Sequence, residues 1–356
     1  MTADFVEEIL RTSEGRMIGD GLHWVDVQEI RARCRTYDDW YPLLTEIADR
    51  YERLGVEALE AGHGVTAGEH FWRASMYCHY AQFYAHQTPA LREAGQRRKV
   101  ALYGRGAPLF VPPAERVEIP FEGFTVPGWL RRPPGVRRAP CAILIGGLES
   151  TKEESYLFEN MCLARGVATF AFDGPGQGEM WFETPIRGDF ERFTSAVVDW
   201  LATRPEIDPG RLGVLGRSLG GHYAAKSAAH DRRLRSAVCW GALYDVGSCW
   251  DSMHFLLKEG FRYCARRPTF EDARRHLECI DLRGWPERIE GALYVQHGAR
   301  DDLIPVAQAE RLAREATRAR RVVLHVEPEG NHCCHNLYHL TRAPMADFLA
   351  DTLSEP

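Results

Sequence analysis

The fold of this chain can be inferred from one stretch, Leu212-Gly-Val-Leu-Gly-Arg-Ser-Leu-Gly-Gly221. Residues 212–215 form a short apolar run typical of a buried strand, and the alanine-rich residues 224–229 favour a helix. Between them, residues 216–220 have the form G-x-S-x-G, which in this setting is typical of a nucleophile elbow. Because glycine and serine are common, the motif alone is also compatible with an ordinary glycine-rich turn. Whether Ser218 is a nucleophile therefore depends on partner residues elsewhere in the chain.

Two later segments supply the partners that a nucleophilic serine needs. Asp301 lies three residues beyond Gly298, at the end of an apolar run, and is the predicted triad acid. Its neighbour Asp302 is expected to be a solvated turn residue. His332 follows the last apolar run and is the predicted general base toward Ser218. The chain order Ser, Asp, His is that of α/β-hydrolases.

Two backbone N–H groups are predicted to form an oxyanion hole, which would stabilise negative charge on a substrate oxygen. Leu219 follows the serine at a predicted helix start, where backbone N–H groups lack helical acceptors. Leu148 follows Gly146-Gly147 after an early strand, where this fold places its second donor. The two glycines would let the backbone approach a substrate closely.

Short apolar strands alternate with helices through the second part of the chain. The predicted strands are residues 141–145, 168–172, 212–215, 236–240, 292–297 and 322–326, and helices are predicted at 153–165, 190–202 and 306–319. Continuous apolar strands separated by helices indicate a parallel sheet that is covered on both faces. The fold class is therefore α/β: an α/β-hydrolase fold with a mostly parallel, doubly wound sheet. Residues 116–120 and 125–130 are predicted as a hairpin that precedes it.

The first part of the chain is predicted to be helical from residue 20 to about 108. Thr36 and Asp39 would begin one helix, and the aromatic residues between 66 and 86 are typical of a helix buried among others. Glycines and prolines in residues 104–113 break this pattern. We expect a helical N-terminal cap at 1–112 and a hydrolase core at 113–356, with a small insertion at about 245–290 over the mouth of the site.

Composition excludes several classes of function. The chain has 356 residues, a net charge of −6 and 45% hydrophobic residues, so nothing in it favours nucleic acid or an anionic membrane as a partner. No apolar run approaches the roughly 20 residues that span a bilayer, and the N-terminus does not resemble a signal peptide. The ten cysteines are scattered, as is typical of reduced thiols, and a cytoplasmic location is expected.

Other motifs favour structural roles. Residues 332–335, His-Cys-Cys-His, lack the usual zinc spacing, so no metal is expected there. Residues 173–178, Asp-Gly-Pro-Gly-Gln-Gly, lack the G-K-[ST] ending of a phosphate loop and are predicted to be a turn at the rim of the site. His222 is expected to pack against the pocket wall, and Arg217 to be a structural partner.

Four segments resemble the FrsA-like family of α/β-hydrolases. They are residues 146–154, 172–179, 213–221 and 330–336, and the likeness extends to residues 73–77 and 96–100. The resemblance implies cleavage of a C–C bond beside a carbonyl, a helical cap over the site and a triad of Ser218, Asp301 and His332.

The chain departs from this family in one respect. Residues 244–254, where the resemblance implies an additional glutamate, contain none. Asp251 is the predicted substitute, with Asp245 and His254 as alternatives.

The expected function is that of a cofactor-independent serine hydrolase that forms an acyl-enzyme. The expected substrate is a small ketone, such as an aryl ketone or a 1,3-diketone of polyketide type, cleaved at a C–C bond. A carboxylesterase or thioesterase acting on a small ester is the alternative. A non-catalytic binding protein is a third class, which three groups at catalytic spacing argue against. A homodimer is compatible with the sequence, which does not determine the oligomeric state.

Overall fold

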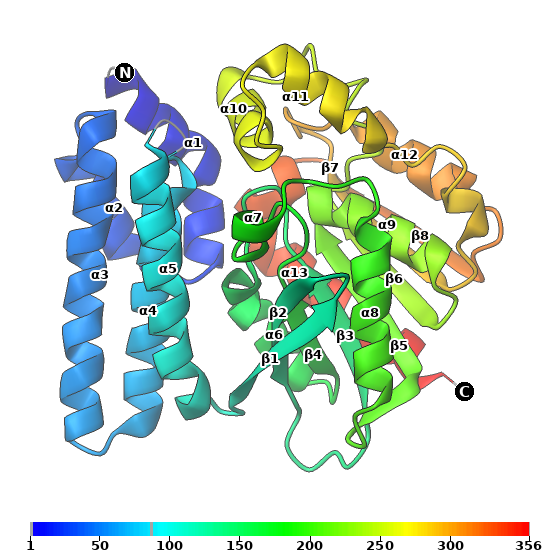
Figure 1. Cartoon of the computed structure of the whole chain (residues 1–356), viewed down its shortest axis with the longest axis horizontal. Helices are drawn as coiled ribbons and strands as arrows, with labels where there is room; N and C mark the ends of the chain where they lie inside the picture. The colour runs from blue at the N-terminus through cyan, green and yellow to red at the C-terminus, as the bar shows by residue number, and fades with distance from the viewer. Residues whose placement is uncertain (1–2, 86–87, 356) are drawn as a thin grey trace. The chain divides into compact units, whose positions relative to one another are not determined.

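The computed structural model describes residues 3–85 and 88–355. Its internal contacts divide the chain into two compact units, residues 1–115 and 116–356. Figure 1 shows that the first unit is mainly helical and that the second contains a sheet with helices.

The described residues of the first unit form five α-helices. They are α1 (Ala3–Gly19), α2 (Trp24–Arg33), α3 (Tyr37–Glu60), α4 (Gly64–Phe83) and α5 (Pro89–Gly106), followed by the short 3-10 helix η1 (Ala107–Leu109). As predicted, α3 begins after Thr36, whose backbone N–H donates to the Asp39 carboxylate at 2.8 Å. The helix α1 was not predicted, because Ser13 and Gly15 interrupt its apolar positions.

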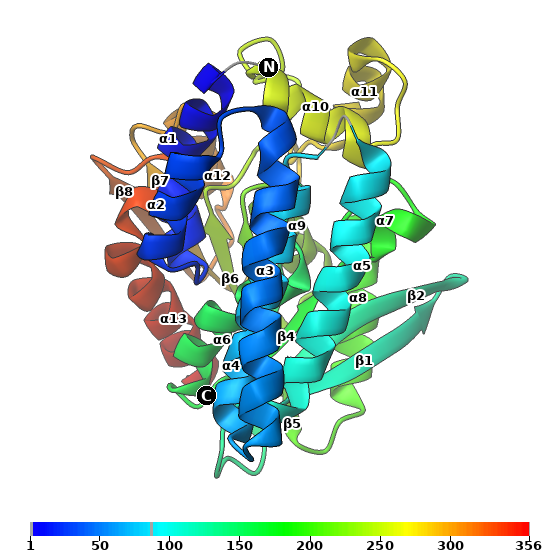
Figure 2. The ribbon, with the colours of Figure 1, turned by 90° about the vertical axis from the view of Figure 1, so that its left-hand side faces the viewer.

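Aromatic residues of α4 fill the interior of this helical unit. The helix packs against both α3 and α5, which stand in front of it in Figure 2, and Phe71, Tyr77 and Tyr80 are completely buried. The ring of Tyr77 stacks on Tyr51 of α3 with the ring centroids 5.2 Å apart. Burial of large aromatic rings is a main source of stability, so these residues are core residues of the first unit.

The second unit contains an eight-stranded sheet with the order β1-β2-β4-β3-β5-β6-β7-β8. Its strands are β1 (Ala114–Phe121), β2 (Phe124–Arg131), β3 (Ala139–Ile145), β4 (Ala168–Phe172), β5 (Ile207–Arg217), β6 (Leu234–Trp240), β7 (Ala292–Gly298) and β8 (Arg321–Glu327). The strand β2 runs antiparallel to β4, and β3 to β8 pair in parallel. The predicted α/β-hydrolase fold class is confirmed.

Helices cover both faces of the sheet, and alternate residues of each strand face the two layers. One face packs against α8 (Phe190–Ala202), α9 (Leu219–His230) and α12 (Val306–Glu315), with Val214 of β5 in that core. The other packs against α6 (Tyr156–Leu163) and α13 (Tyr338–Ser354), with Leu215 in that core. Burial on both faces explains why these strands are almost continuously apolar. Short helices η2 (Lys152–Ser155), α7 (Met180–Glu183), η3 (Leu277–Cys279), η4 (Pro286–Arg288) and η5 (His332–Leu337) lie in the connections.

The predicted insertion, residues 245–290, lies within the segment between β6 and β7. It contains α10 (Phe255–Cys264) and α11 (Phe270–His276). Three of its side chains, Met253, Leu257 and Phe261, line a cavity that also contains Ser218. The insertion therefore contributes to the surroundings of the predicted nucleophile.

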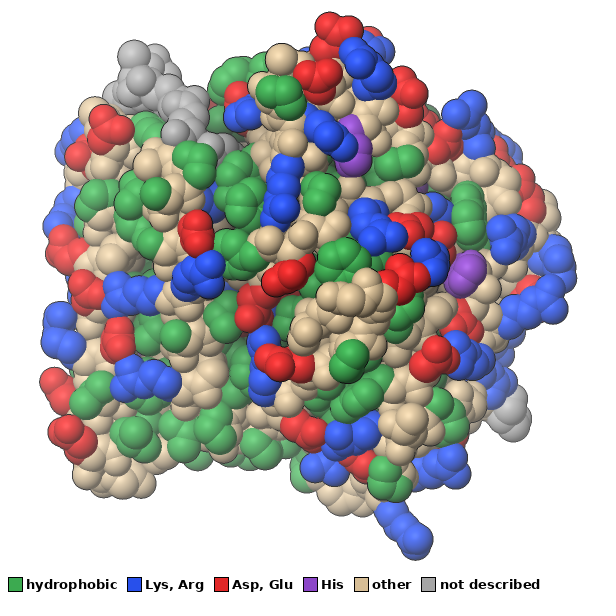
Figure 3. Space-filling view, viewed as in Figure 1, with side chains coloured by type: hydrophobic (Ala, Val, Ile, Leu, Met, Phe, Trp, Pro, Cys, Tyr) green, Lys and Arg blue, Asp and Glu red, His purple; other side chains and the backbone are tan. Residues whose placement is uncertain are grey.

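The surface carries both signs of charge. Figure 3 shows acidic and basic side chains interspersed on the face in view. None of the helices in residues 3–85 and 88–355 is long and apolar enough to cross a membrane. All ten cysteines are free thiols, and Cys279 is the exposed one among them.

Candidate active site

The turn between β5 and α9 has the conformation of a nucleophile elbow. Ser218 has φ 57° and ψ −119°, a strained conformation for a residue with a side chain. A Cβ atom added at Gly216 would lie 1.8 Å from the carbonyl oxygen of Gly220, and one at Gly220 would lie 2.4 Å from that of Gly146. Both glycines of the motif are therefore required by the close approach of neighbouring backbone.

The three predicted triad residues meet at the carboxyl ends of the strands. The Nε2 atom of His332 lies 3.0 Å from Ser218 Oγ, and its Nδ1 atom lies 2.8 Å from Asp301 Oδ2. With the proton on Nδ1, the ring donates to the carboxylate and accepts from the serine hydroxyl. This is the arrangement in which a histidine can remove the serine proton.

The Asp301 carboxylate is held firmly in its buried position. Its Oδ1 atom accepts from the backbone N–H groups of Leu303 at 2.9 Å and Ile304 at 2.8 Å. Burial by itself would raise the pKa of Asp301, but the attraction of His332 and His297 and the N–H of Ile304 lower it below its ordinary value. Asp302 is exposed, as expected.

The pKa of His332 is set by the same pair. Burial by itself would lower this pKa, but the charge of the Asp301 carboxylate outweighs burial and raises it well above its ordinary value. An imidazolium at His332 is thus stabilised, as a general base toward Ser218 would require.

The segment that follows His332 is strained and tied to β6. Cys333 and Cys334 both have positive φ, at 54° and 50°. The indole N–H of Trp240 donates to the carbonyl oxygen of Cys333 at 2.5 Å, and the Cys333 thiol lies 3.4 Å from His332 Nε2. In the described parts of the chain, no group of three or more His, Cys, Asp or Glu residues could hold a metal ion.

The two predicted oxyanion residues lie close to the serine. Leu219 is the first residue of α9, so its N–H has no acceptor within the helix. Leu148 follows Gly147, and a Cβ atom added at Gly147 would lie 3.3 Å from Ser218 Cβ. Both leucines line the same cavity as Ser218 and His332. Their N–H groups are thus candidates for binding a substrate oxygen.

The cavity at Ser218 is almost entirely apolar. The empty space within its lining is about 290 Å³, which includes open solvent. Its lining residues are Leu148, Ser218, Leu219, Leu243, Met253, Leu257, Phe261, Leu303, Ile304 and His332. A small, uncharged group would fit such a lining best, because its apolar side chains offer a charged group no partner.

The three candidates for an auxiliary acid are absent from this lining. Asp251 forms a two-point pair with Arg274, at 2.9 and 3.2 Å, and its side chain is 80% exposed. The carboxylate of Asp245 accepts from the N–H and hydroxyl of Ser248. The Nδ1 atom of His254 accepts from the N–H of Leu257 at the start of α10. The structure does not bring these residues together with the triad.

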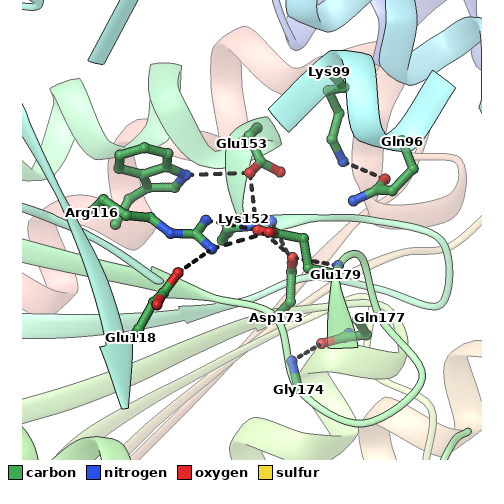
Figure 4. A network of polar contacts seen from close by, with 11 residues as sticks. Gln96, Lys99, Arg116, Glu118, Lys152, Glu153, Asp173, Gly174, Gln177 and Glu179 are labelled. Atoms are coloured by element: carbon green, nitrogen blue, oxygen red, sulfur yellow. Dashed lines mark hydrogen bonds and ion pairs between the residues drawn. The ribbon is translucent and has the colours of Figure 1, made fainter. Parts of the chain in front are cut away.

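A buried ionic cluster lies next to the loop that carries Leu148. The fully buried ammonium group of Lys152 lies 2.7 Å from Asp173 and 2.8 Å from Glu153, and it also contacts Glu179 (Figure 4). Asp173 in addition accepts from the backbone N–H of Lys152 at 2.9 Å. Arg116 pairs with Glu179 at 2.7 Å. Such clusters are stable only while every charge keeps its partner.

Only part of this cluster was predicted from the sequence. The turn after β4, residues 173–178, was predicted to lie at the rim of the site, but its polar partners were not predicted. Its Asp173 and Gln177 contact the loop after β3, which lies 21 to 31 residues earlier in the chain. No local spacing indicates a contact between residues so far apart. Arg217, predicted to be structural, pairs with the buried Glu154 at 2.5 Å.

The sheet order and the serine elbow define the class of protein: a hydrolase of the α/β-hydrolase fold. The profile of the prolyl oligopeptidase family matches residues 159–355, more than half of the chain. The chain belongs to this family of serine hydrolases.

The most informative relative is the 2,6-dihydropseudooxynicotine hydrolase of Paenarthrobacter nicotinovorans. It is 42% identical over 340 residues, which cover 95% of this chain and 91% of the relative. The crystal structure of the 2,6-dihydroxy-pseudo-oxynicotine hydrolase superimposes with a TM-score of 0.89, over 96% of this chain and 95% of that one. This similarity confirms the resemblance that the sequence motifs indicated.

More distant similarities are limited to part of the chain or to the fold. The α/β-hydrolase ucsC of Acremonium is 34% identical over 58% of this chain and 47% of its own length. The structure of AbyA5 has a TM-score of 0.75 over 98% of both chains at 20% identity, and this likeness shows the fold alone.

Proposed function

We propose that this protein is a serine hydrolase that cleaves a C–C bond beside a carbonyl group through an acyl-enzyme. The observation that supports this most directly is the hydrogen-bonded chain from Asp301 through His332 to Ser218, which ends at an apolar cavity. All three groups come from loops at the carboxyl ends of strands, where ligands of such sheets bind.

The reaction would proceed in two halves. In the first, Ser218 Oγ attacks the carbonyl carbon while His332 takes its proton, and the N–H groups of Leu148 and Leu219 bind the oxyanion. The C–C bond then breaks, and the leaving carbon takes a proton from the His332 imidazolium. In the second half, water attacks the acyl group with His332 as base. This releases a carboxylic acid and restores Ser218.

Cleavage of a C–C bond is supported by the family resemblance and by the relative from Paenarthrobacter nicotinovorans. The relative is named for hydrolysis of 2,6-dihydropseudooxynicotine and is 42% identical over 95% of this chain. We propose a small aryl ketone or 1,3-diketone as the substrate, because the apolar lining would accept an uncharged ring or chain.

One observation favours a second candidate, a carboxylesterase or thioesterase. Among the described residues that line the cavity, none carries a carboxylate that could protonate a leaving carbon. A carbanion is a poorer leaving group than an alkoxide, and general acid catalysis contributes roughly a hundredfold to ten-thousandfold. A C–C substrate must therefore stabilise its own leaving group, as a 1,3-diketone does, or depend on His332 as its acid.

The two candidates differ in their preferred substrate. We expect kcat/KM for an aryl 1,3-diketone to exceed that for a p-nitrophenyl ester with the same acyl group, measured by product release at equal enzyme concentration. Efficient ester hydrolysis without C–C cleavage across a panel of aryl ketones would establish the esterase instead.

Ser218→Ala tests the mechanism that both candidates share. Loss of the nucleophile should lower kcat by up to roughly a millionfold on either substrate, because triad members act as a unit. The melting temperature should change little, since alanine keeps the Cβ atom and removes only the hydroxyl group with its hydrogen bond to His332. As a control, Ser248→Ala removes a serine outside the cavity lining and should leave kcat unchanged. Retention of a tenth of the activity in Ser218→Ala would contradict a covalent mechanism.

A further inference from the structure

The amide of Gln177 links the turn after β4 to the loop that carries Leu148. Its Nε2 atom donates to two successive carbonyl oxygens, those of Gly146 at 2.6 Å and Gly147 at 2.9 Å. Its Oε1 atom accepts from the backbone N–H of Gly174 at 3.2 Å. Figure 4 shows this last contact beside the ionic cluster.

The orientation of this amide is well determined by its surroundings. Gln177 is 2% exposed, so water competes little for its donors. Rotation of the amide by 180° would place Oε1 against two carbonyl oxygens and Nε2 against an N–H group, an arrangement without any hydrogen bond. Both donors of the side chain therefore stay on the loop after β3.

The contact with Gly147 determines where the N–H of Leu148 points. In a trans peptide, the C=O of one residue and the N–H of the next lie in one plane and point in opposite directions. The Gly147 carbonyl and the Leu148 N–H belong to the same peptide group. By holding that carbonyl toward itself, Gln177 turns the Leu148 N–H to the opposite side.

The residue before Leu148 lies against the predicted nucleophile. A Cβ atom added at Gly147 would lie 3.1 Å from the carbonyl oxygen of Arg217 and 3.3 Å from Ser218 Cβ, so the peptide lies directly against the elbow. Leu148 itself lines the cavity with Ser218. Residues 146 and 147 are both glycine, which lacks the steric restraints that limit peptide rotation in other residues. An external restraint is therefore needed.

We propose that Gln177 is a positioning residue for the oxyanion hole, which holds the Leu148 N–H toward the oxygen that develops negative charge. The proposal rests on the proposed serine mechanism and adds to it a residue that does not touch the substrate. Oxyanion donors stabilise the transition state more than the bound substrate. Loss of the restraint should thus lower kcat and leave KM nearly unchanged.

The test uses Gln177→Met, which keeps the length of the side chain and removes both donors, and Gln177→Asn, whose shorter amide cannot keep both contacts. The matched control is Gln308→Met. Gln308 is also a buried glutamine that bonds to a loop backbone, at Tyr244 N (2.6 Å), but that loop does not carry an oxyanion residue. The probe is a small fluorophosphonate, whose adduct with Ser218 places a phosphonyl oxygen in the oxyanion hole.

We expect both Gln177 variants to label Ser218 roughly tenfold to a hundredfold more slowly than the unaltered protein. With a p-nitrophenyl ester, kcat should fall by a similar factor while KM changes less than twofold. We expect the melting temperature of Gln308→Met to fall by an amount similar to that of the Gln177 variants. Its labelling rate should stay within threefold of that of the unaltered protein. Wild-type labelling rates in folded Gln177 variants, or an equal loss in the Gln308 control, would overturn the inference. Absence of labelling in the unaltered protein would instead contradict the serine mechanism itself.

Discussion

The pKa of one histidine controls the expected pH dependence of this site. His332 can accept the Ser218 proton only when its ring is neutral. Because the Asp301 carboxylate raises the pKa of His332 well above its ordinary value, kcat/KM should rise with pH and level off only above that raised pKa. Below it, the ring is already protonated and activity is lost.

Asp301→Asn should shift this profile and lower its plateau. Without the carboxylate, burial is the main influence on His332, and burial lowers the pKa. The acid limb of kcat/KM should therefore move to lower pH, and the plateau should fall by about four orders of magnitude, the effect of losing a triad carboxylate. The measurement is the full pH–rate profile of both proteins. An unchanged limb would show that another group controls the profile. Asp302→Asn is the neighbouring control and should leave limb and plateau in place.

At the scale of elements, the junction of β5 and α9 leaves no room for a side chain at either glycine of the motif. In Gly216→Ala the new methyl group would meet the Gly220 carbonyl oxygen, part of the backbone that forms the elbow. Overpacking of this kind typically costs about 1–3 kcal/mol of unfolding free energy. Activity should fall further than stability, because any relief of the clash moves Ser218.

Gly210→Ala is the control for this substitution. Gly210 lies on the same strand β5, is exposed, and an added Cβ would have its nearest neighbour at 3.5 Å. Urea unfolding and kcat of the two variants are compared. Equal, small effects in both would contradict the steric account of the elbow.

Lys152 links the loop after β3 to the loop after β4 through ion pairs. Lys152→Met would leave three carboxylates, those of Glu153, Asp173 and Glu179, without their shared cation in a buried place. Removal of one partner from a buried ionic cluster costs roughly 3–5 kcal/mol. We expect this loss in urea unfolding at neutral pH.

Lys258→Met is the control, because Lys258 has only a long contact of 3.4 Å with a backbone oxygen and no buried partner among the described residues. Its effect on unfolding should stay within about 0.5 kcal/mol. If Lys152→Met had an equally small effect on the free energy of unfolding, the cluster would contribute little to holding these loops.

At the scale of the whole molecule, the two units have separate cores. Both hydrophobic clusters of the sheet begin at residue 117 or later. The prediction that residues 1–112 form a cap can therefore be tested by expressing residues 113–356. We expect this fragment to keep a cooperative unfolding transition and labelling of Ser218 by a small fluorophosphonate, and to lose at least a hundredfold in turnover of an aryl ketone. Full turnover by the fragment would refute the cap.

The sequence by itself determined the fold class and singled out three residues that the structure brings together. Parallel strands end at one edge of the sheet, so residues that follow three different strands must gather there. The order of Ser218, Asp301 and His332 therefore predicted a meeting that the structure contains. The motif also predicted the elbow, because only glycines allow the backbone contacts at Gly216 and Gly220.

Only the tertiary structure decided which other side chains reach the site. Asp251 was a plausible acid from its place in the insertion, but Arg274, 23 residues later, holds it at the surface. Gln177 lay in an apparent structural turn, and its contacts with Gly146 and Gly147 join loops that are 30 to 31 residues apart. Side-chain direction in a loop depends on which distant segments pack against it, and no local pattern of residues encodes that.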